Sequence, residues 1–85
     1  MPAERILVVD DEEANRNLLR DILRPLGYQV REAADGEEAL AAVAECAPDL
    51  VLLDLMMPRR NGYEVCRELK SDPRTRLLPI IILTT

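Results

Sequence analysis

The chain has 85 residues, a length that suits a single domain. Its net charge of −5 argues against a nucleic-acid surface, which needs a basic patch, and is compatible with binding a cation. Hydrophobic residues make up 48% of the chain, but Tyr28 and Tyr63 are its only aromatic residues, so the core must be aliphatic.

Several kinds of site and segment are disfavoured. The chain has two cysteines, Cys46 and Cys66, without a CxxC motif, and no histidine, which argues against a zinc site. The first residues have neither the basic start nor the apolar stretch of a signal peptide. No apolar run approaches the roughly 18 residues of a membrane span. We therefore expect a cytosolic protein that is not associated with a membrane and has free thiols.

The first predicted element is a buried strand, residues 5–9, which runs into Asp10 and Asp11. A helix follows and should end near Gly27, a residue suited to a left-handed C-cap, with Pro25 limiting the last turn. Apolar residues at i, i+4 spacing predict its buried stripe, namely Ala14, Leu18, Leu19, Ile22, Leu23 and Leu26.

The next two elements are a strand and a second helix. Residues 28–33 alternate between apolar and polar types, which predicts a strand with one wet face at the edge of a sheet. Asp35 is a suitable N-cap for the second helix because Glu38 follows three residues later. Pro48 should end that helix.

The central strand is predicted at residues 50–54, where a continuous apolar run ends in Asp54. Residues 59–62 are typical of a turn. A third helix should begin near Tyr63 and close around residues 70–71, with its apolar positions at Tyr63, Val65, Cys66 and Leu69. After a polar loop, residues 80–83 form the last predicted strand, which runs into Thr84 and Thr85.

The predicted order is therefore βαβαβαβ. Strands that alternate with helices indicate an α/β domain with a mostly parallel, doubly wound sheet and helices on both of its faces. Right-handed crossovers between parallel strands then restrict the topology.

The acidic residues suggest the chemistry. If the first and third strands are neighbours, Asp10, Asp11 and Asp54 converge at the carboxyl edge of the sheet. Three carboxylates this close repel one another unless a cation neutralises them, and oxygen ligands point to Mg²⁺ or Mn²⁺. A carboxylate beside such a cation could attack phosphorus, and the hydroxyl of Thr84 could hydrogen-bond the phosphoryl group.

Each of these residues also has a plain structural interpretation. Asp10 and Asp11 could cap the first helix, Asp54 could be an ordinary turn residue, and a threonine at a strand end is often structural. The joint pattern favours a site, because two strands end in acid and a third ends in a hydroxyl.

On these residues the chain resembles the receiver domains of two-component response regulators. The similarity extends over essentially all 85 residues and is carried by five stretches, residues 6–12, 35–40, 49–58, 61–62 and 79–84. It implies a flavodoxin-like, CheY-like fold with the strand order 2-1-3-4.

The resemblance also implies roles for the site residues. Asp54 would accept a phosphoryl group from a sensor histidine kinase or a phosphotransfer protein. Asp11 and Asp54 would bind Mg²⁺ directly, Asp10 largely through water, and the backbone carbonyl of Met56 would be a further ligand. Thr84 would be the switch hydroxyl. Such a domain takes part in its own phosphorylation and is not a turnover enzyme.

The family pattern continues with a lysine, a fifth strand and two more helices that residues 1–85 do not contain. We therefore expect a receiver domain truncated after its fourth strand. It would be either a fragment of a longer regulator or a chain that covers the exposed side of that strand by forming a homodimer. One alternative is an interaction and dimerisation module that is not phosphorylated. Another is a small Mg²⁺-dependent phosphatase with Asp10 as its nucleophile.

Overall fold

The computed structural model describes residues 4–57 and 61–83, which form one four-stranded parallel sheet in the order β2-β1-β3-β4. The strands are β1 (Arg5–Val9), β2 (Gln29–Ala33), β3 (Leu50–Asp54) and β4 (Ile80–Leu83). The helices are α1 (Glu13–Leu23), the short 3₁₀ helix η1 (Arg24–Leu26), α2 (Gly36–Cys46) and α3 (Gly62–Ser71). The predicted βαβαβαβ fold and the strand order 2-1-3-4 are confirmed.

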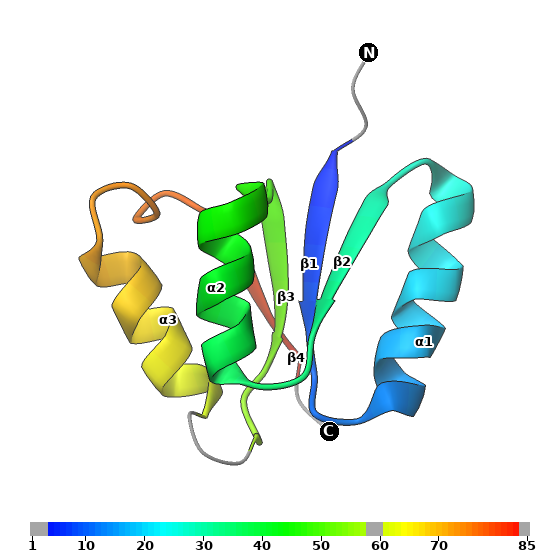
Figure 1. The fold of residues 1–85 in the computed structure, drawn as a ribbon, viewed down its shortest axis with the longest axis horizontal. Coiled ribbons are helices and arrows are strands. Elements are labelled where there is room, and N and C mark those ends of the chain that lie inside the picture. Colours follow the sequence, from blue (N-terminus) through cyan, green and yellow to red (C-terminus); the bar gives the residue numbers. More distant parts are fainter. Residues whose placement is uncertain (1–3, 58–60, 84–85) are drawn as a thin grey trace.

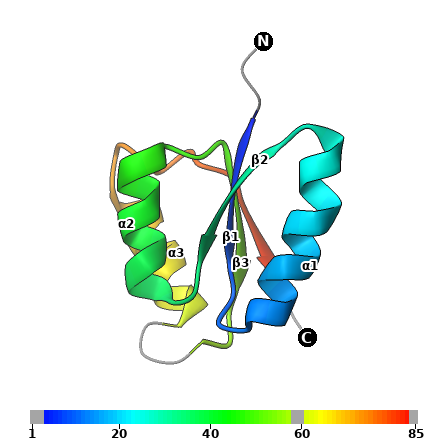
Figure 2. The same ribbon diagram turned by 45° about the vertical axis from the view of Figure 1, so that its right-hand side comes forward.

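The helices lie in two layers, with α2 and α3 on one face of the sheet and α1 on the other (Figures 1 and 2). Alternate residues of the central strands supply the two cores, because successive side chains of a strand point to opposite faces. Leu7, Val51 and Leu53 belong to the core under α2 and α3. Val8 and Leu52 belong to the smaller core under α1.

The pairing of β1 with β3 positions the predicted acids. These two strands occupy the centre of the sheet and are almost fully buried. In their register Val9 lies opposite Leu53, so the next residues, Asp10 and Asp54, leave the sheet side by side. As the alternation of its sequence predicted, β2 is an edge strand with exposed residues.

The predicted stripe of α1 is largely wrong. Leu19 and Leu23 pack against the sheet, whereas Leu18, Ile22 and Leu26 are 60%, 51% and 69% exposed. Ala14 is exposed as well. The reason is that the helix lies over β1 and β2 with one narrow row of side chains, and no described element covers the rest of its apolar surface.

The end of α1 follows from its proline and glycine. Pro25 falls in η1, so the α-helix ends at Leu23 and the chain continues through one 3₁₀ turn. Gly27 then has φ +98°, which confirms the predicted left-handed cap. Leu26 lies beyond the helix and cannot continue its stripe.

Side chains cap the other two helices. Asp35 accepts the amide hydrogen of Glu38 at 2.9 Å, as predicted, while the Glu38 carboxylate accepts the amide of Ala34 at 3.2 Å. Asn61, predicted to lie in a turn, is the N-cap of α3 and accepts the amide of Glu64 at 3.0 Å. In α3, Val65 and Leu69 are buried, but Tyr63 is 64% exposed and does not belong to the core.

The described helices include none that is both long and apolar enough to cross a membrane.

Gly62 brings the first turn of α3 against the end of β3. Its amide donates to the carbonyl of Leu55 at 3.1 Å. A Cβ atom at this position would lie 2.5 Å from the carbonyl oxygen of Asp54 and 2.7 Å from the Cα of Leu55. Both contacts are with backbone, which cannot move aside as a side chain can. This part of the fold therefore requires a glycine.

Replacing Gly62 with alanine should lower the free energy of unfolding by roughly 1–3 kcal/mol, the usual cost of forcing extra atoms into a packed site. Alanine improves helix propensity by less than about 1 kcal/mol, so the backbone clash should dominate. Urea denaturation measures the change, with Tyr63→Ala, at the neighbouring exposed position, as the control that should change little. A Gly62→Ala protein as stable as the wild type would contradict this account of the contact.

Candidate metal centre at the carboxyl edge of the sheet

Three carboxylates meet where β1 and β3 leave the sheet. One oxygen from each of Asp10, Asp11 and Asp54 lies within 4.8 Å of the others. Asp10 and Asp54 are only 5% and 7% exposed, whereas Asp11 is exposed. The fold therefore brings together the three acids that the sequence singled out, with two of them nearly buried.

Asp10 is fixed in place by hydrogen bonds. Its Oδ1 accepts the amide hydrogen of Glu12 at 2.9 Å, and its Oδ2 accepts the side-chain amide of Asn15 at 3.2 Å. Its backbone carbonyl accepts Nη1 of Arg16 at 2.7 Å, and its own amide donates to the carbonyl of Ala33 on β2 at 3.1 Å. The N-cap position of α1 is occupied by Glu12 and not by Asp10. Glu12 makes no side-chain capping bond.

Asp54 closes a short turn. Its Oδ1 accepts the amide hydrogen of Met56 at 3.0 Å, so the residue is a turn former as well as a member of the cluster. Met57 packs in the core at 7% exposure, while Met56 is 76% exposed. The role of the Met56 carbonyl as a ligand stays a prediction. Thr84, the predicted switch hydroxyl, lies outside the described residues.

The electrostatics of the cluster favour a cation. Two unit charges at such a separation repel by roughly 3 kcal/mol at an effective dielectric constant of about 20. Within residues 4–57 and 61–83, none of the ion pairs found involves Asp10, Asp11 or Asp54. A cluster made only of carboxylate oxygens suits a hard divalent ion, and these residues could hold one.

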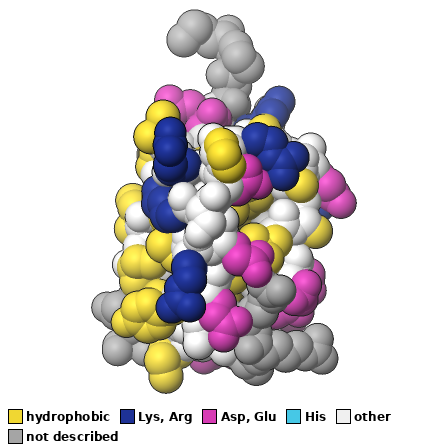
Figure 3. All heavy atoms as spheres, turned by 90° about the vertical axis from the view of Figure 1, so that its left-hand side faces the viewer, with side chains coloured by type: hydrophobic (Ala, Val, Ile, Leu, Met, Phe, Trp, Pro, Cys, Tyr) yellow, Lys and Arg dark blue, Asp and Glu magenta, His cyan; other side chains and the backbone are white. Residues whose placement is uncertain are grey.

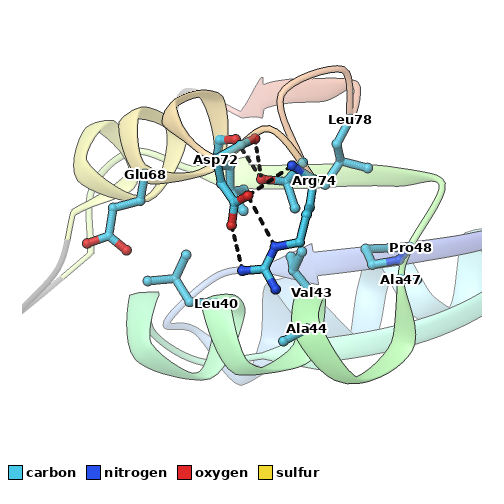
Figure 4. Close-up of a pocket in the computed structure, with 11 residues that line it drawn as sticks. Leu40, Val43, Ala44, Ala47, Pro48, Glu68, Asp72, Arg74 and Leu78 are labelled. Atoms are coloured by element: carbon cyan, nitrogen blue, oxygen red, sulfur yellow. Dashed lines mark hydrogen bonds and ion pairs between the residues drawn. The ribbon is translucent and has the colours of Figure 1, made fainter.

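The other concave surfaces are less suited to such chemistry. A groove of about 430 Å³ lies between α2, the end of α3 and the loop that follows, at the opposite edge of the sheet (Figure 4). Leu40, Val43 and Leu78 are among its lining residues, and Arg74, which also lines it, pairs with Asp72 of the same loop at 2.9 Å. The Asp72 carboxylate accepts hydrogen bonds from the side chain and from the backbone amide of Arg74, and these bonds lower its pKa.

Among the residues that the structure describes, the surface on the α3 side carries charged side chains of both signs (Figure 3). Acidic and basic side chains are interspersed there, and hydrophobic side chains gather along the margin on the side of β4 (Figure 3). This distribution agrees with the exposure of Ile81 and Ile82, which are 50% and 39% exposed.

Sequence reasoning did not identify Asn15 and Arg16 as part of the site. Both lie in the first turn and a half of α1, on the side that faces back toward the end of β1. The available signal was their position five and six residues after Asp10, because the start of a helix that follows a strand directly can reach back to the strand's exit.

Comparisons with known proteins place the chain in a family. Residues 6–85 match the model of the response regulator receiver domain. Response regulator PleD of Caulobacter vibrioides is 52% identical over 80 residues, which are 94% of this chain and 18% of PleD. DNA-binding response regulator MtrA of Mycolicibacterium smegmatis is 48% identical over 81 residues, which are 95% of this chain and 34% of MtrA. The chain thus spans about a fifth to a third of the length of these relatives.

Solved structures agree with this result. The N-terminal domain of a response regulator receiver protein from Methanoculleus marisnigri superposes with a TM-score of 0.92 at 42% identity, over 94% of this chain and 65% of that one. Response regulator TrrA of Thermotoga maritima, solved in complex with Mg²⁺-BeF, gives 0.88 at 43% identity, over 95% of this chain and 69% of TrrA. From its sequence, its parallel sheet and its acidic cluster, this chain belongs to the response regulator receiver domain family of two-component systems.

Proposed function

We propose that the chain accepts a phosphoryl group on Asp54 in a reaction that requires Mg²⁺, and that it passes on the signal by a change of conformation or association. The observation that carries this proposal is the convergence of Asp10, Asp11 and Asp54 within 4.8 Å at the end of the central strands. The domains of this family are signalling proteins, and we propose that this one is a phosphoacceptor without turnover of its own.

Asp54 is the proposed nucleophile. One of its carboxylate oxygens forms a bond to phosphorus while the bond between phosphorus and the donor group breaks, giving an acyl phosphate. The amide of Met56 holds Oδ1, and no hydrogen bond to Oδ2 is found among the described residues. Oδ2 is therefore the oxygen better placed to attack.

The proposed metal ligands are the oxygens of Asp11 and Asp54 and the backbone carbonyl of Met56, with Asp10 acting largely through water. A bound Mg²⁺, or Mn²⁺ in its place, would neutralise negative charge on the phosphoryl oxygens. The complex of TrrA with Mg²⁺-BeF supports this assignment, because TrrA shares the fold and 43% of the aligned residues.

The proposed donor is a sensor histidine kinase or a phosphotransfer protein in the cytoplasm. Thr84, which directly follows β4, is the proposed hydroxyl that hydrogen-bonds the phosphoryl group. A DNA-binding role in the name of a relative such as MtrA concerns that whole protein, of which this chain matches 34%. With a net charge of −5, this segment itself is not proposed to bind nucleic acid.

Incubation with acetyl phosphate and Mg²⁺ should add about 80 Da, the mass of one phosphoryl group, as read by intact-mass spectrometry. Asp54→Ala should abolish the adduct because it removes the nucleophile. Asp49→Ala, a carboxylate just before the same strand at its other end, should keep it. An unmodified wild-type protein that nevertheless binds Mg²⁺ would favour an interaction module that is not phosphorylated.

Asp11→Asn should raise the melting temperature in the presence of a chelator, because it removes one of three repelling charges. The same change should diminish the stabilisation by Mg²⁺, which for the wild type reaches about 2.7 kcal/mol at a concentration one hundred times the dissociation constant. Differential scanning calorimetry with and without MgCl₂ measures both effects. Asp21→Asn removes an equal charge from a side chain that is 70% exposed, and it should leave the gain from Mg²⁺ unchanged.

A second proposed property is self-association through β4. This strand pairs with β3 on one side only within the described sheet, and Ile81 and Ile82 on it are half exposed. Unpaired backbone groups on an apolar edge strand favour pairing with another chain. We propose that a second copy covers this edge, as the exposed apolar side chains and the lack of a charged residue in Ile80–Leu83 suggest.

Size-exclusion chromatography with light scattering should therefore give a dimer at micromolar concentration. Ile81→Lys should shift it to the monomer, because a lysine on an edge strand opposes pairing. Leu77→Lys, at a position 87% exposed but outside the strand, serves as the control and should remain dimeric. A wild-type protein that runs as a stable monomer would rule out self-association.

A further inference from the structure

Asn15 makes a contact with the acidic cluster that the family assignment does not explain. Its side-chain amide donates to Oδ2 of Asp10 at 3.2 Å, from the third residue of α1. Asp10 is 5% exposed, so this hydrogen bond replaces water at a nearly buried carboxylate. Such a bond to a charged group is worth more than one between neutral groups.

The other hydrogen bonds of Asp10 hold different atoms from the one that Asn15 holds. The amide of Glu12 donates to Oδ1. The backbone carbonyl of Asp10 accepts from Arg16, and its backbone amide donates to Ala33. Only the Asn15 bond restrains Oδ2 among the described residues. With it in place both carboxylate oxygens have a donor, and the plane of the carboxylate cannot turn about its χ2 bond without losing one of them.

Arg16 keeps the first turns of α1 in position for this contact. Its side chain is 15% exposed, and its guanidinium lies between the carbonyl of Asp10 at 2.7 Å and the carboxylate of Glu32 on β2 at 3.4 Å. Arg20, one turn further on, reaches the other oxygen of Glu32 at 3.5 Å. The helix that carries Asn15 is thus tied to two strands, so its side chain is presented at a fixed place.

Asp11 differs from Asp10 in how far its carboxylate is restrained by the described residues. Asp11 is exposed, and no hydrogen bond to its side chain is found among the described residues, so its carboxylate is free to turn toward an ion. Asp10 is already satisfied on both oxygens and has one further acceptor site on each. Removing a group that holds a metal ligand in one orientation typically weakens metal binding by about 10- to 100-fold.

We propose that Asn15 is a positioning residue for the metal centre, which holds the Asp10 carboxylate in the orientation in which it faces the cation and its water. This inference rests on the proposed Mg²⁺ site. It assigns to Asn15 an effect on metal affinity, beyond the stability that any hydrogen bond to a buried carboxylate contributes.

The 85-residue chain is titrated with MgCl₂ alone, and isothermal titration calorimetry measures the dissociation constant of Mg²⁺. Asn15→Leu keeps the approximate volume and removes the donor, and it should weaken Mg²⁺ binding about 10-fold, at the low end of the effects of such outer residues. Asn15→Ala should weaken it to a similar degree and serves if the leucine variant does not fold. Circular dichroism confirms the fold of each variant before titration.

Asn17→Leu is the matched control. Asn17 is the same residue type, on the same helix and of the same intermediate exposure, and it makes no hydrogen bond to the three acids among the described residues. It should leave Mg²⁺ affinity unchanged. A merely structural role for Asn15 would lower the melting temperature without Mg²⁺ but leave the affinity of the folded protein at the wild-type value.

The outcomes separate this inference from the proposed function. If the wild type binds Mg²⁺ and folded Asn15→Leu or Asn15→Ala binds it equally well, Asn15 has no positioning role and the metal site stands. If the wild type does not bind Mg²⁺, the proposed metal site is overturned and this inference with it. If affinity falls in both variants and not in Asn17→Leu, the positioning role is supported.

Discussion

The mutual repulsion of three carboxylates is the constraint on which the candidate site depends. It arises because β1 and β3 are parallel neighbours, with Val9 opposite Leu53, so that Asp10 and Asp54 leave the sheet at the same height. The cost of holding these charges within 4.8 Å of one another is met by aliphatic packing below them, where Leu7, Val51 and Leu53 are fully buried. The core therefore supports an arrangement that is unfavourable in itself and that a cation would relieve.

The three acids are not equivalent. Asp10 is nearly buried and held by α1, Asp54 is nearly buried and held by the turn that follows it, and Asp11 is exposed. A site with two restrained carboxylates and one free carboxylate combines a fixed geometry with a group that can adjust as an ion enters. Asp10 and Asp11 are successive residues just beyond the end of β1, and they differ in burial although their carboxylates meet in the same cluster.

Much of the fold could be predicted because its signals are local. The apolar runs that end in Asp10 and Asp54 indicated buried strands, and Asp35 and Gly27 marked helix ends that the structure confirms. The convergence of the acids followed once the first and third strands were taken as neighbours. What failed depended on packing between distant elements. The apolar spacing of α1 predicted a buried stripe, but whether Leu18 and Ile22 are covered depends on which elements lie beside the helix.

The carboxylates of the candidate site could be predicted from the sequence, but the residues that hold them in place could not. Strand ends identify the carboxylates, whereas the contact from Asn15 depends on the angle at which α1 leaves β1. The close approach at Gly62 depends on how α3 meets β3, which no local pattern reveals. The role of the Met56 carbonyl rests on the family resemblance, whereas Thr84 was also indicated by its place after the last strand and lies outside the described residues.

The exposed position of Tyr63 has a practical consequence. The chain has no tryptophan, so its ultraviolet fluorescence comes from its two tyrosines. Tyr63 lines, with Met56 and Asn61, a shallow hollow that also includes Leu55, the residue that follows Asp54. The protein therefore carries a natural optical reporter at the margin of its candidate site, and the other tyrosine, Tyr28, lies at the opposite end of the sheet, where β2 begins.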